Sequence, residues 1–217
     1  LKTCGIRGFN LTMPNKNKIV ELLDELSPEA QLIGAVNTVL NDNGRLIGYN
    51  TDGYGFMQSV RDAGHDITGK NITVMGVGGA SMAICAQSAL DGAASVHIFA
   101  RRTSRYWNRT QKFAENLSAK TGCQVCLFDN DDHTALRDSI AQSYLLINAT
   151  SVGMVPDIDD TIIKDTSLFH PELVVADVVY EPQETRLLLH QGAKAFQIWT
   201  GQEMPVSVIK EKYFSVK

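Results

Sequence analysis

The pattern of apolar and polar residues divides the chain into two parts. The first part is predicted to contain helices and a hairpin. Residues 16–30 read KNKIVELLDELSPEA, in which apolar residues recur with the spacing of one helix face. The residues on that face are Ile19, Leu22, Leu23 and Leu26. This spacing predicts an amphipathic helix with a buried apolar side.

A hairpin and a second helix are predicted next. The apolar segments 35–40 and 45–50 flank Asn-Asp-Asn-Gly, a sequence typical of a tight hairpin turn. Residues 52–63 predict a helix that ends at Gly64. The following segment 64–70, GHDITGK, is typical of a connector, so we expect a domain boundary close to it.

From Asn71 onward, short apolar strands alternate with helices. The predicted strands are residues 71–75, 95–100, 124–129, 144–150 and 173–179. Helices are predicted between them, most clearly at 80–90 and 105–120. This alternation predicts an α/β fold with a Rossmann-like, doubly wound parallel sheet covered by helices on both faces.

Composition narrows the class of protein. The 217 residues are 44% hydrophobic and 20% charged, as is typical of a soluble globular protein with one large domain or two small ones. The net charge of −4 argues against a broad nucleic-acid-binding surface. We expect no membrane span and no signal peptide. Because the first residue is Leu1, we expect the natural start to precede it.

The possible metal ligands form no convincing pattern. The four cysteines are Cys4, Cys85, Cys123 and Cys126. Only the last two form a C-x-x-C, and a zinc site usually needs a second pair. The five histidines have no metal spacing, and the three aspartates of the segment 155–160 do not make a convincing metal site. We expect reduced cysteines, no bound metal and a cytoplasmic location.

A glycine-rich turn joins the strand 71–75 to a helix. Its sequence is GVGGAS, residues 76–81. Glycines at such a turn let the backbone approach a pyrophosphate, and the helix N-terminus offers free N–H groups. Ser81 stands at the third glycine position of the usual motif. The turn predicts a dinucleotide site, with a tight turn without ligand as the alternative.

The end of the next strand bears on the choice of cofactor. An NAD site usually carries an acidic residue about 20 residues after the glycine loop. Here Ala100 takes that place, followed by Arg101, Arg102 and Arg105. Guanidinium groups form charge-assisted hydrogen bonds with a phosphate, so the sequence favours NADP over NAD. The alternative is a solvated basic loop.

Seven motifs in order identify a resemblance that covers nearly the whole chain. They are GFNLTMPNK, GAVNT, GYNTDG, GVGGAS, NATSVGM, DVVYEPQET and QGAKAF. Together they closely resemble the shikimate dehydrogenase family, including its quinate/shikimate branch. The resemblance implies NADP-dependent, reversible reduction of 3-dehydroshikimate to shikimate. It also implies a smaller α/β substrate-binding domain (residues 1–51 with 191–217) and an NADP-binding Rossmann-like domain (residues 52–190).

The resemblance implies a role for residues that match the family's motifs. The catalytic pair corresponds to Lys16 and Asp52. The substrate-binding residues correspond to Asn10, Thr12, Asn37, Thr51, Tyr180 and Gln191. The cofactor-binding residues correspond to Gly76, Gly78, Gly79, Ala80, Arg101, Arg102, Thr150, Ser151 and Val178. Some quinate-branch members that accept NAD carry an acidic residue after the arginine pair, whereas this chain has Thr103.

Two departures from the family pattern stand out. The family's first strand, with its paired serines, is expected before Leu1. In addition, TRLLLH runs directly into QGAKAF at His190 and Gln191, where the family has a further segment that includes a Gly-rich part near the nicotinamide. We expect that residues have been omitted at this junction.

The chemistry explains why a lysine and an aspartate suit this reaction. Reducing a ketone requires a hydride on carbon and a proton on oxygen; a lysine can stabilise the developing alkoxide and donate the proton. We expect Asp52 to position Lys16 and to share that proton. Residue types alone leave alternatives: Asp52 as a helix cap, with Asn37 and Thr51 serving only the turn.

Alternatives also remain for the protein as a whole. One is a quinate/shikimate dehydrogenase that uses NAD or NADP, and another is a dinucleotide-binding regulatory homologue without turnover. We expect a small-molecule substrate and no nucleic-acid or membrane partner, with a homodimer as one possible assembly.

Overall fold

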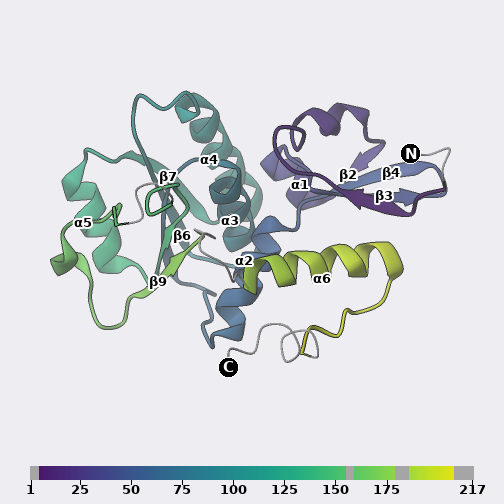
Figure 1. Cartoon of the computed structure of the whole chain (residues 1–217). Coiled ribbons are helices and arrows are strands. Elements are labelled where there is room, and N and C mark those ends of the chain that lie inside the picture. The colour runs from purple at the N-terminus through teal and green to yellow at the C-terminus, as the bar shows by residue number, and fades with distance from the viewer. Residues whose placement is uncertain (1–4, 155–158, 179–185, 208–217) are drawn as a thin grey trace. The chain divides into compact units, whose positions relative to one another are not determined.

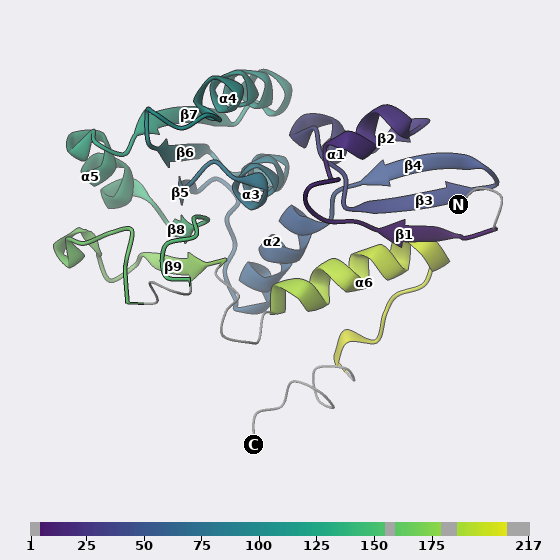
Figure 2. The same cartoon turned by 45° about the horizontal axis from the view of Figure 1, so that its top comes forward.

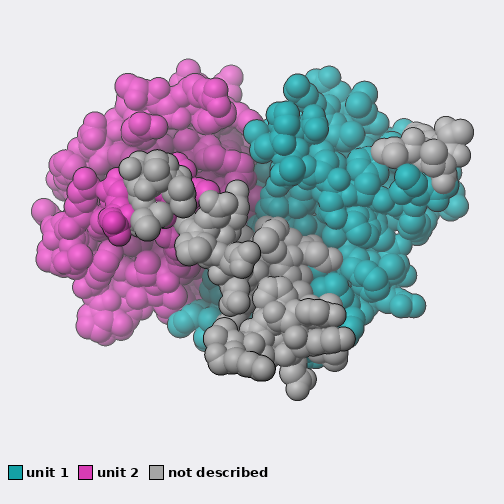
Figure 3. Space-filling view, in the orientation of Figure 1, with its two compact units in different colours: residues 1–65, 184–217 teal, residues 66–183 magenta. Residues whose placement is uncertain are grey.

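The chain forms two compact units. The computed structural model describes residues 5–154, 159–178 and 186–207, with the backbone alone between 186 and 192. One unit comprises residues 1–65 with 184–217, and the other comprises residues 66–183 (Figures 1 and 3). The predicted domain boundaries, after residues 51 and 190, differ from this division. The reason is that α2 (Asp52–Asp62) packs along α6 (Arg186–Thr200), which keeps both helices in the first unit.

The second unit is built on a parallel sheet of five strands. The strands are β5 (Asn71–Met75), β6 (Ser95–Ala100), β7 (Gln124–Asp129), β8 (Leu145–Asn148) and β9 (Val174–Asp177). Their order is β7-β6-β5-β8-β9, and every neighbouring pair is parallel. All five predicted strands are therefore present, and the predicted Rossmann-like parallel sheet is confirmed. The direction of winding reverses between β5 and β8, which is the place where such sheets bind ligands.

Helices cover this sheet. They are α3 (Gly79–Leu90), α4 (Trp107–Thr121) and α5 (His133–Gln142), and a short 3-10 helix η3 (Thr166–Leu168) precedes β9. α3 and α4 lie next to each other (Figure 2). Because parallel crossovers are right-handed, the return connection through α5 lies on the opposite face. There Ile140 packs into one apolar cluster with Met75 and Phe99.

The first unit holds a smaller mixed sheet. Its strands are β1 (Gly8–Asn10), β2 (Glu25–Leu26), β3 (Thr38–Asp42) and β4 (Arg45–Tyr49), in the order β1-β3-β4-β2. β3 and β4 form the predicted hairpin, and both of its turn residues, Asn43 and Gly44, have positive φ. The short helix α1 (Pro28–Ile33) begins behind Ser27, whose side chain accepts a hydrogen bond from the Ala30 N–H.

The prediction of one helix over residues 16–30 is wrong. The segment forms a 3-10 helix, η2 (Lys18–Leu22), then the strand β2 and then α1. Ile19, Leu23 and Leu26 do pack against a buried apolar cluster in this unit, but Leu22 is 71% exposed. The sheet edge decides the outcome, because Asp24 N donates to Leu46 O (2.9 Å) and Ser27 N donates to Gly48 O (2.8 Å). These ladder bonds replace those that a continuous helix would have made.

Helix α6 is fixed to the small sheet through Trp199. The indole Nε1 of Trp199 donates to Val39 O (3.0 Å). A Cβ at Gly8 would overlap that indole, so only glycine fits beneath it. Across the described residues, no helix combines the length and the apolar character that crossing a membrane requires.

Candidate active site

Lys16 and Asp52 form an ion pair in the first unit. Lys16 lies in the loop after β1, where its carbonyl oxygen accepts a hydrogen bond from Val36 N (2.8 Å), and Asp52 is the first residue of α2. Lys16 Nζ lies 2.6 Å from Asp52 Oδ2, and the two side chains are only 19% and 14% exposed. Partial burial reduces the screening of this contact by water and salt. The lysine is thus held against the carboxylate and does not extend into solvent.

Asn37 ties Asp52 to the start of the hairpin. Its amide Nδ2 donates to Asp52 Oδ1 (2.7 Å) and to Thr51 Oγ1 (3.1 Å). One carboxylate oxygen of Asp52 therefore accepts a hydrogen bond from Asn37, and the other accepts one from Lys16. Thr51 is the N-cap residue of α2 and makes no side-chain cap hydrogen bond. The carboxylate of Asp52 contacts the lysine and the amide, which is not the arrangement of a simple helix cap.

The other predicted substrate-binding residues differ in how the structure places them. Asn10 Nδ2 donates to Thr38 Oγ1 (2.9 Å) and to Asn37 O (3.2 Å), so Asn10 belongs to the hydrogen-bonded group around Lys16 and Asp52. Thr12 is exposed in the loop that leads to Lys16, where its carbonyl accepts a hydrogen bond from Asn15 N (2.9 Å). Thr51 is buried. Tyr180 and the side chain of Gln191 lie outside the described residues.

Two further residues belong to this group and were missed from the sequence. Thr38 is fully buried, and its hydroxyl donates to Asn37 Oδ1 (3.0 Å). Asn50 is also buried; its Oδ1 accepts from Asp52 N (3.1 Å) and its Nδ2 donates to Ala35 O (3.1 Å). A signal was available, because both are polar residues in otherwise apolar strand ends, where a buried polar group needs a partner.

The glycine loop is tightly held on one side and open on the other. Gly76 has a φ of +109°, and a Cβ there would lie 2.7 Å from Ala149 O. Gly78 is the N-cap residue of α3 and Gly79 its first residue, and a Cβ at either would face open space. Ala80 is exposed beside them. This leaves the N–H groups of the first turn of α3 accessible to an anion.

Ser81 explains why this glycine motif departs from the usual form. Its side chain is buried, and its Oγ donates to Gly76 O (2.5 Å). The residue is small enough for the close approach of helix and strand, and its hydroxyl adds a bond that closes the loop. The substitution therefore fits the predicted dinucleotide site.

The basic loop after β6 carries three guanidinium groups. The guanidinium carbon of Arg102 lies 4.7 Å from the centre of the Trp107 ring, and that of Arg105 lies 4.7 Å from the Tyr106 ring. Arg105 Nη2 also donates to Tyr106 Oη (2.6 Å). Among the described residues, none of Arg101, Arg102 and Arg105 forms an ion pair with a carboxylate. The charge of this loop is available for an external anion.

Thr150, Ser151 and Val178 follow the strands at the same edge of the sheet. Thr150 Oγ1 donates to Asn148 Oδ1 (2.7 Å) at the end of β8, and Ser151 is exposed. Val178 N donates to Asn148 O (3.0 Å) just after β9. These residues and the glycine loop lie at the carboxyl ends of β5, β8 and β9, where doubly wound sheets bind their ligands. The residues present fit a dinucleotide.

The cysteines of the C-x-x-C stay apart from this chemistry. Cys123 is buried just before β7 and Cys126 is half-buried within it, and both are free thiols. Burial, with a smaller contribution from Cys126, raises the pKa of the Cys123 thiol to about 11. Within the described part of the chain, no three His, Cys, Asp or Glu side chains lie close enough to share a metal ion.

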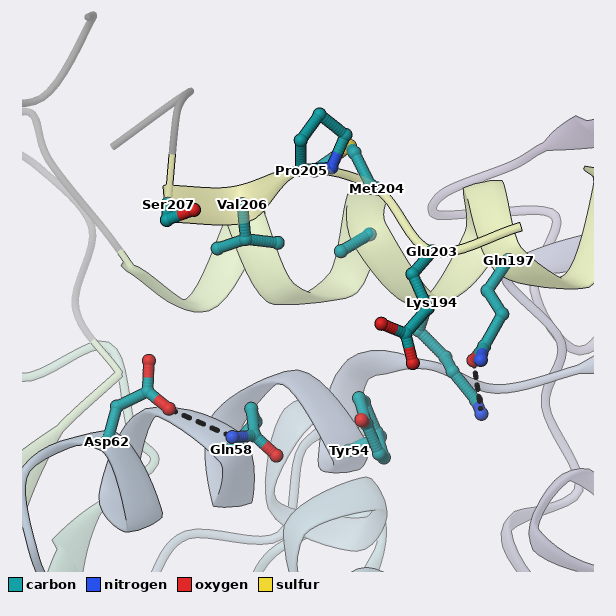
Figure 4. Close-up of a pocket in the computed structure, with 11 residues that line it drawn as sticks. Tyr54, Gln58, Asp62, Lys194, Gln197, Glu203, Met204, Pro205, Val206 and Ser207 are labelled. Atoms are coloured by element: carbon teal, nitrogen blue, oxygen red, sulfur yellow. Dashed lines mark hydrogen bonds between the residues drawn. The ribbon is translucent and has the colours of Figure 1, made fainter. Parts of the chain in front are cut away.

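A groove of about 740 Å³ lies between α2, α6 and the segment that follows α6 (Figure 4). Its polar groups are largely bonded to one another. Lys194 Nζ donates to Gln197 Oε1 (3.1 Å) and lies 4.9 Å from the Tyr54 ring centre, and Gln58 Nε2 donates to Asp62 Oδ1 (2.9 Å). None of the predicted site residues lines the groove.

Comparison with known proteins gives the family. A family model of the shikimate dehydrogenase substrate binding domain matches residues 1–39, and a model of the shikimate 5′-dehydrogenase C-terminal domain matches residues 185–212. The shikimate dehydrogenase (NADP(+)) of Listeria innocua is 48% identical over 98% of this chain and 79% of its own length. The chain belongs to the shikimate dehydrogenase family. The family and the oxidoreductase class predicted from the sequence are confirmed.

Solved structures of the family agree with the fold. The shikimate 5-dehydrogenase of Listeria monocytogenes, in complex with shikimate and NAD, is 46% identical and superposes with a TM-score of 0.92 over 97% of this chain and 78% of that chain. The quinate dehydrogenase of Corynebacterium glutamicum, in complex with NAD, is 30% identical with a TM-score of 0.83 over 100% of this chain and 83% of that chain.

The alignment with the Listeria innocua relative is longer than this chain. It runs over 230 positions although this chain has only 217 residues, so it contains positions that this chain lacks. In the structure α6 continues through the junction of residues 190 and 191 without a break. The departure from the family pattern at this junction, and the omission of residues as its cause, both stay predictions.

Proposed function

We propose that this chain catalyses the NADP-dependent, reversible reduction of 3-dehydroshikimate to shikimate. The names of its close relatives confirm the predicted reaction and cofactor class. The observation that carries the proposal in this chain is the 2.6 Å contact between Lys16 and Asp52, which presents an ammonium group on a fixed carboxylate.

The proposed roles of the pair follow from the chemistry of a carbonyl. The bound cofactor supplies or accepts the hydride. Lys16 Nζ donates the proton to the carbonyl oxygen during reduction and accepts it during oxidation. Asp52 Oδ2 holds Nζ in position and shares the proton, so the two residues act as one coupled unit.

Substrate binding is assigned to the residues around this pair. We assign the hydroxyl and carboxylate groups of the substrate to Asn10, Thr12, Thr51, Tyr180 and Gln191. Asn37 has a double role in this assignment. Its Nδ2 already donates to Asp52 and Thr51, so it orders the carboxylate as well as facing the substrate.

Cofactor binding is assigned to the carboxyl edge of the parallel sheet. The pyrophosphate is assigned to Gly76, Gly78, Gly79 and Ala80, the nicotinamide side to Thr150, Ser151 and Val178, and the adenosine 2′-phosphate to Arg101 and Arg102. The exposed helix N-terminus and the guanidinium groups, which have no carboxylate partner among the described residues, support this assignment. Residues 66–183 thus form the cofactor domain, and residues 1–65 with 184–217 the substrate domain.

A quinate/shikimate dehydrogenase that also accepts NAD is the second candidate. Two structural relatives carry NAD, and one of them is a quinate dehydrogenase. Thr103 and the arginine pair favour NADP in this chain. The third candidate is a regulatory homologue without turnover; the Lys16–Asp52 pair argues against it, and the segments expected before Leu1 and at residues 190 and 191 are its basis. A homodimer and a cytoplasmic location stay predictions.

The deciding experiment measures initial rates with shikimate and with quinate, each with NADP⁺ and with NAD⁺. The proposal expects the highest kcat/KM for the pair of shikimate and NADP⁺. A higher value for quinate with NAD⁺ would favour the second candidate. If the folded protein binds NADP⁺ but turns over neither substrate, the regulatory alternative holds and the proposal is wrong.

A further inference from the structure

Thr38 occupies a buried position two hydrogen bonds away from the carboxylate of Asp52. It lies in the centre of the small sheet, where it pairs with Asn10 of β1 on one side and with Tyr49 of β4 on the other. Its exposed fraction is 0%. A hydroxyl at such a position needs partners, and the structure supplies both a donor and an acceptor.

The direction of these two bonds is fixed. The Asn10 amide Nδ2 can only donate, so Thr38 Oγ1 accepts that bond (2.9 Å). The single hydroxyl proton of Thr38 is then free for Asn37 Oδ1, 3.0 Å away. Asn10 thereby sets the direction in which Thr38 donates.

The donated proton in turn fixes the amide of Asn37. Asn37 Oδ1 accepts from the Thr38 hydroxyl and from the Thr51 backbone N–H (3.0 Å), which are both donors. Its Nδ2 faces Asp52 Oδ1 (2.7 Å), which as a carboxylate only accepts. A flipped amide would set its NH₂ against the backbone N–H and its oxygen against the carboxylate. The Thr51 N–H and the Asp52 carboxylate exclude that orientation, and the Thr38 hydroxyl, directed by Asn10, adds a second donor to Asn37 Oδ1.

We infer that Thr38 is a positioning residue for the reaction: its hydroxyl orients the Asn37 amide, which holds Asp52 and, through Asp52, the amino group of Lys16. The inference rests on the proposed function of the Lys16–Asp52 pair. It adds one residue that touches neither substrate nor cofactor. Hydrogen bonds connect Asn10, Thr38, Asn37, Asp52 and Lys16 in that order, and each donor–acceptor distance lies between 2.6 and 3.0 Å.

The test compares two substitutions that separate the hydroxyl of Thr38 from its methyl group. Thr38→Val keeps the branched side chain and removes the hydroxyl, whereas Thr38→Ser keeps the hydroxyl and removes the methyl group. We expect kcat with shikimate and NADP⁺ to fall about tenfold in Thr38→Val, since a buried acceptor loses one of its donors. The KM for NADP⁺ should stay within about twofold, and Thr38→Ser should restore most of kcat.

A matched control separates positioning from stability. Thr73 in β5 of the other unit is equally buried, and its hydroxyl is hydrogen-bonded to Ser143 Oγ (2.7 Å). Thr73→Val should lower the melting temperature in the same way as Thr38→Val and leave kcat unchanged. All variants are assayed at a temperature where circular dichroism shows them folded.

Three outcomes overturn the inference. Thr38→Val could keep the kcat of the natural protein while folded, Thr38→Ser could lose as much as Thr38→Val, or Thr73→Val could lose as much as either. If the natural protein itself turns over neither shikimate nor quinate, the proposed function fails first. Crystal structures of the natural protein and of Thr38→Val then decide the inference, which requires the Asn37 amide or the Lys16 side chain to move.

Discussion

The region around Lys16 and the region around the glycine loop arrange their polar groups in opposite ways. Around Lys16, the polar groups already bond to one another: a lysine on a carboxylate, and that carboxylate on an amide. At the glycine loop and the arginines, the groups for binding face outward, and in the described part of the chain the three guanidiniums have no carboxylate partner.

The difference agrees with the role proposed for each region. Proton transfer requires a donor at a fixed place, and a network of short hydrogen bonds provides that before the substrate arrives. A dinucleotide brings its own charges, so its site needs open N–H groups and cations that the protein has not already neutralised. Substitutions should therefore affect turnover in the first region and cofactor affinity in the second.

The largest effect is expected from Lys16→Ala. Removing the proton donor should lower kcat by roughly 10²–10⁴-fold while the KM for NADP⁺ changes little, since general acid–base help is of that size. Steady-state rates with shikimate and NADP⁺ measure this. Lys18→Ala changes an exposed lysine two residues away and serves as control. Near-full turnover in Lys16→Ala would show that Lys16 is not the proton donor.

The next effect concerns stability at the glycine loop. Gly76→Ala places a Cβ at a φ of +109° and 2.7 Å from Ala149 O. The strained backbone should cost about 1–3 kcal/mol in free energy of unfolding, measurable by urea titration. Gly79→Ala has open space around its Cβ and helical geometry, so its stability should stay unchanged or rise. Equal losses in both variants would contradict this account of the loop.

The arginine loop should give an effect specific to one cofactor. Arg101→Ala and Arg102→Ala should each raise the KM for NADP⁺ about tenfold, because a charge-assisted bond to a phosphate is lost. The KM for NAD⁺, which lacks the 2′-phosphate, should hardly change. Lys112→Ala, an exposed substitution on α4, controls for net charge. A similar rise for both cofactors would place these arginines elsewhere on the nucleotide.

The smallest effect is expected from the ring beneath Arg102. Trp107→Leu removes the aromatic face 4.7 Å from the guanidinium. A cation–π contact at an exposed site is worth about 0.5–1 kcal/mol, so binding of adenosine 2′,5′-bisphosphate should weaken about two- to fivefold by calorimetry. Trp107→Phe keeps a ring and should lie between the two. An unchanged affinity in Trp107→Leu would mean that Arg102 needs no support from the ring.

Much of the fold could be predicted from the order of residues. The five strands of the parallel sheet are short apolar runs between helical segments, and nothing in the tertiary structure competes with that pattern. The hairpin could also be predicted, since Asn43 and Gly44 are residues that readily adopt the positive φ of its turn. The prediction of a helix over residues 16–30 was wrong. Leu23 and Leu26 have helical spacing, but their positions also suit the edge of a sheet, and that edge forms only when β4 is present.

The candidate site, too, could be predicted only in part. The glycine turn and the arginine loop could be recognised from the sequence, because their chemical character does not depend on the fold, whereas the proposed roles of Lys16 and Asp52 came from the resemblance to the family. Three contacts could be seen only in the folded protein: Asn37 holds Asp52, Thr38 is buried behind Asn37, and Ser81 closes the glycine loop. The direction of a hydrogen bond depends on which donors and acceptors meet, and strands distant in sequence bring those together only after folding.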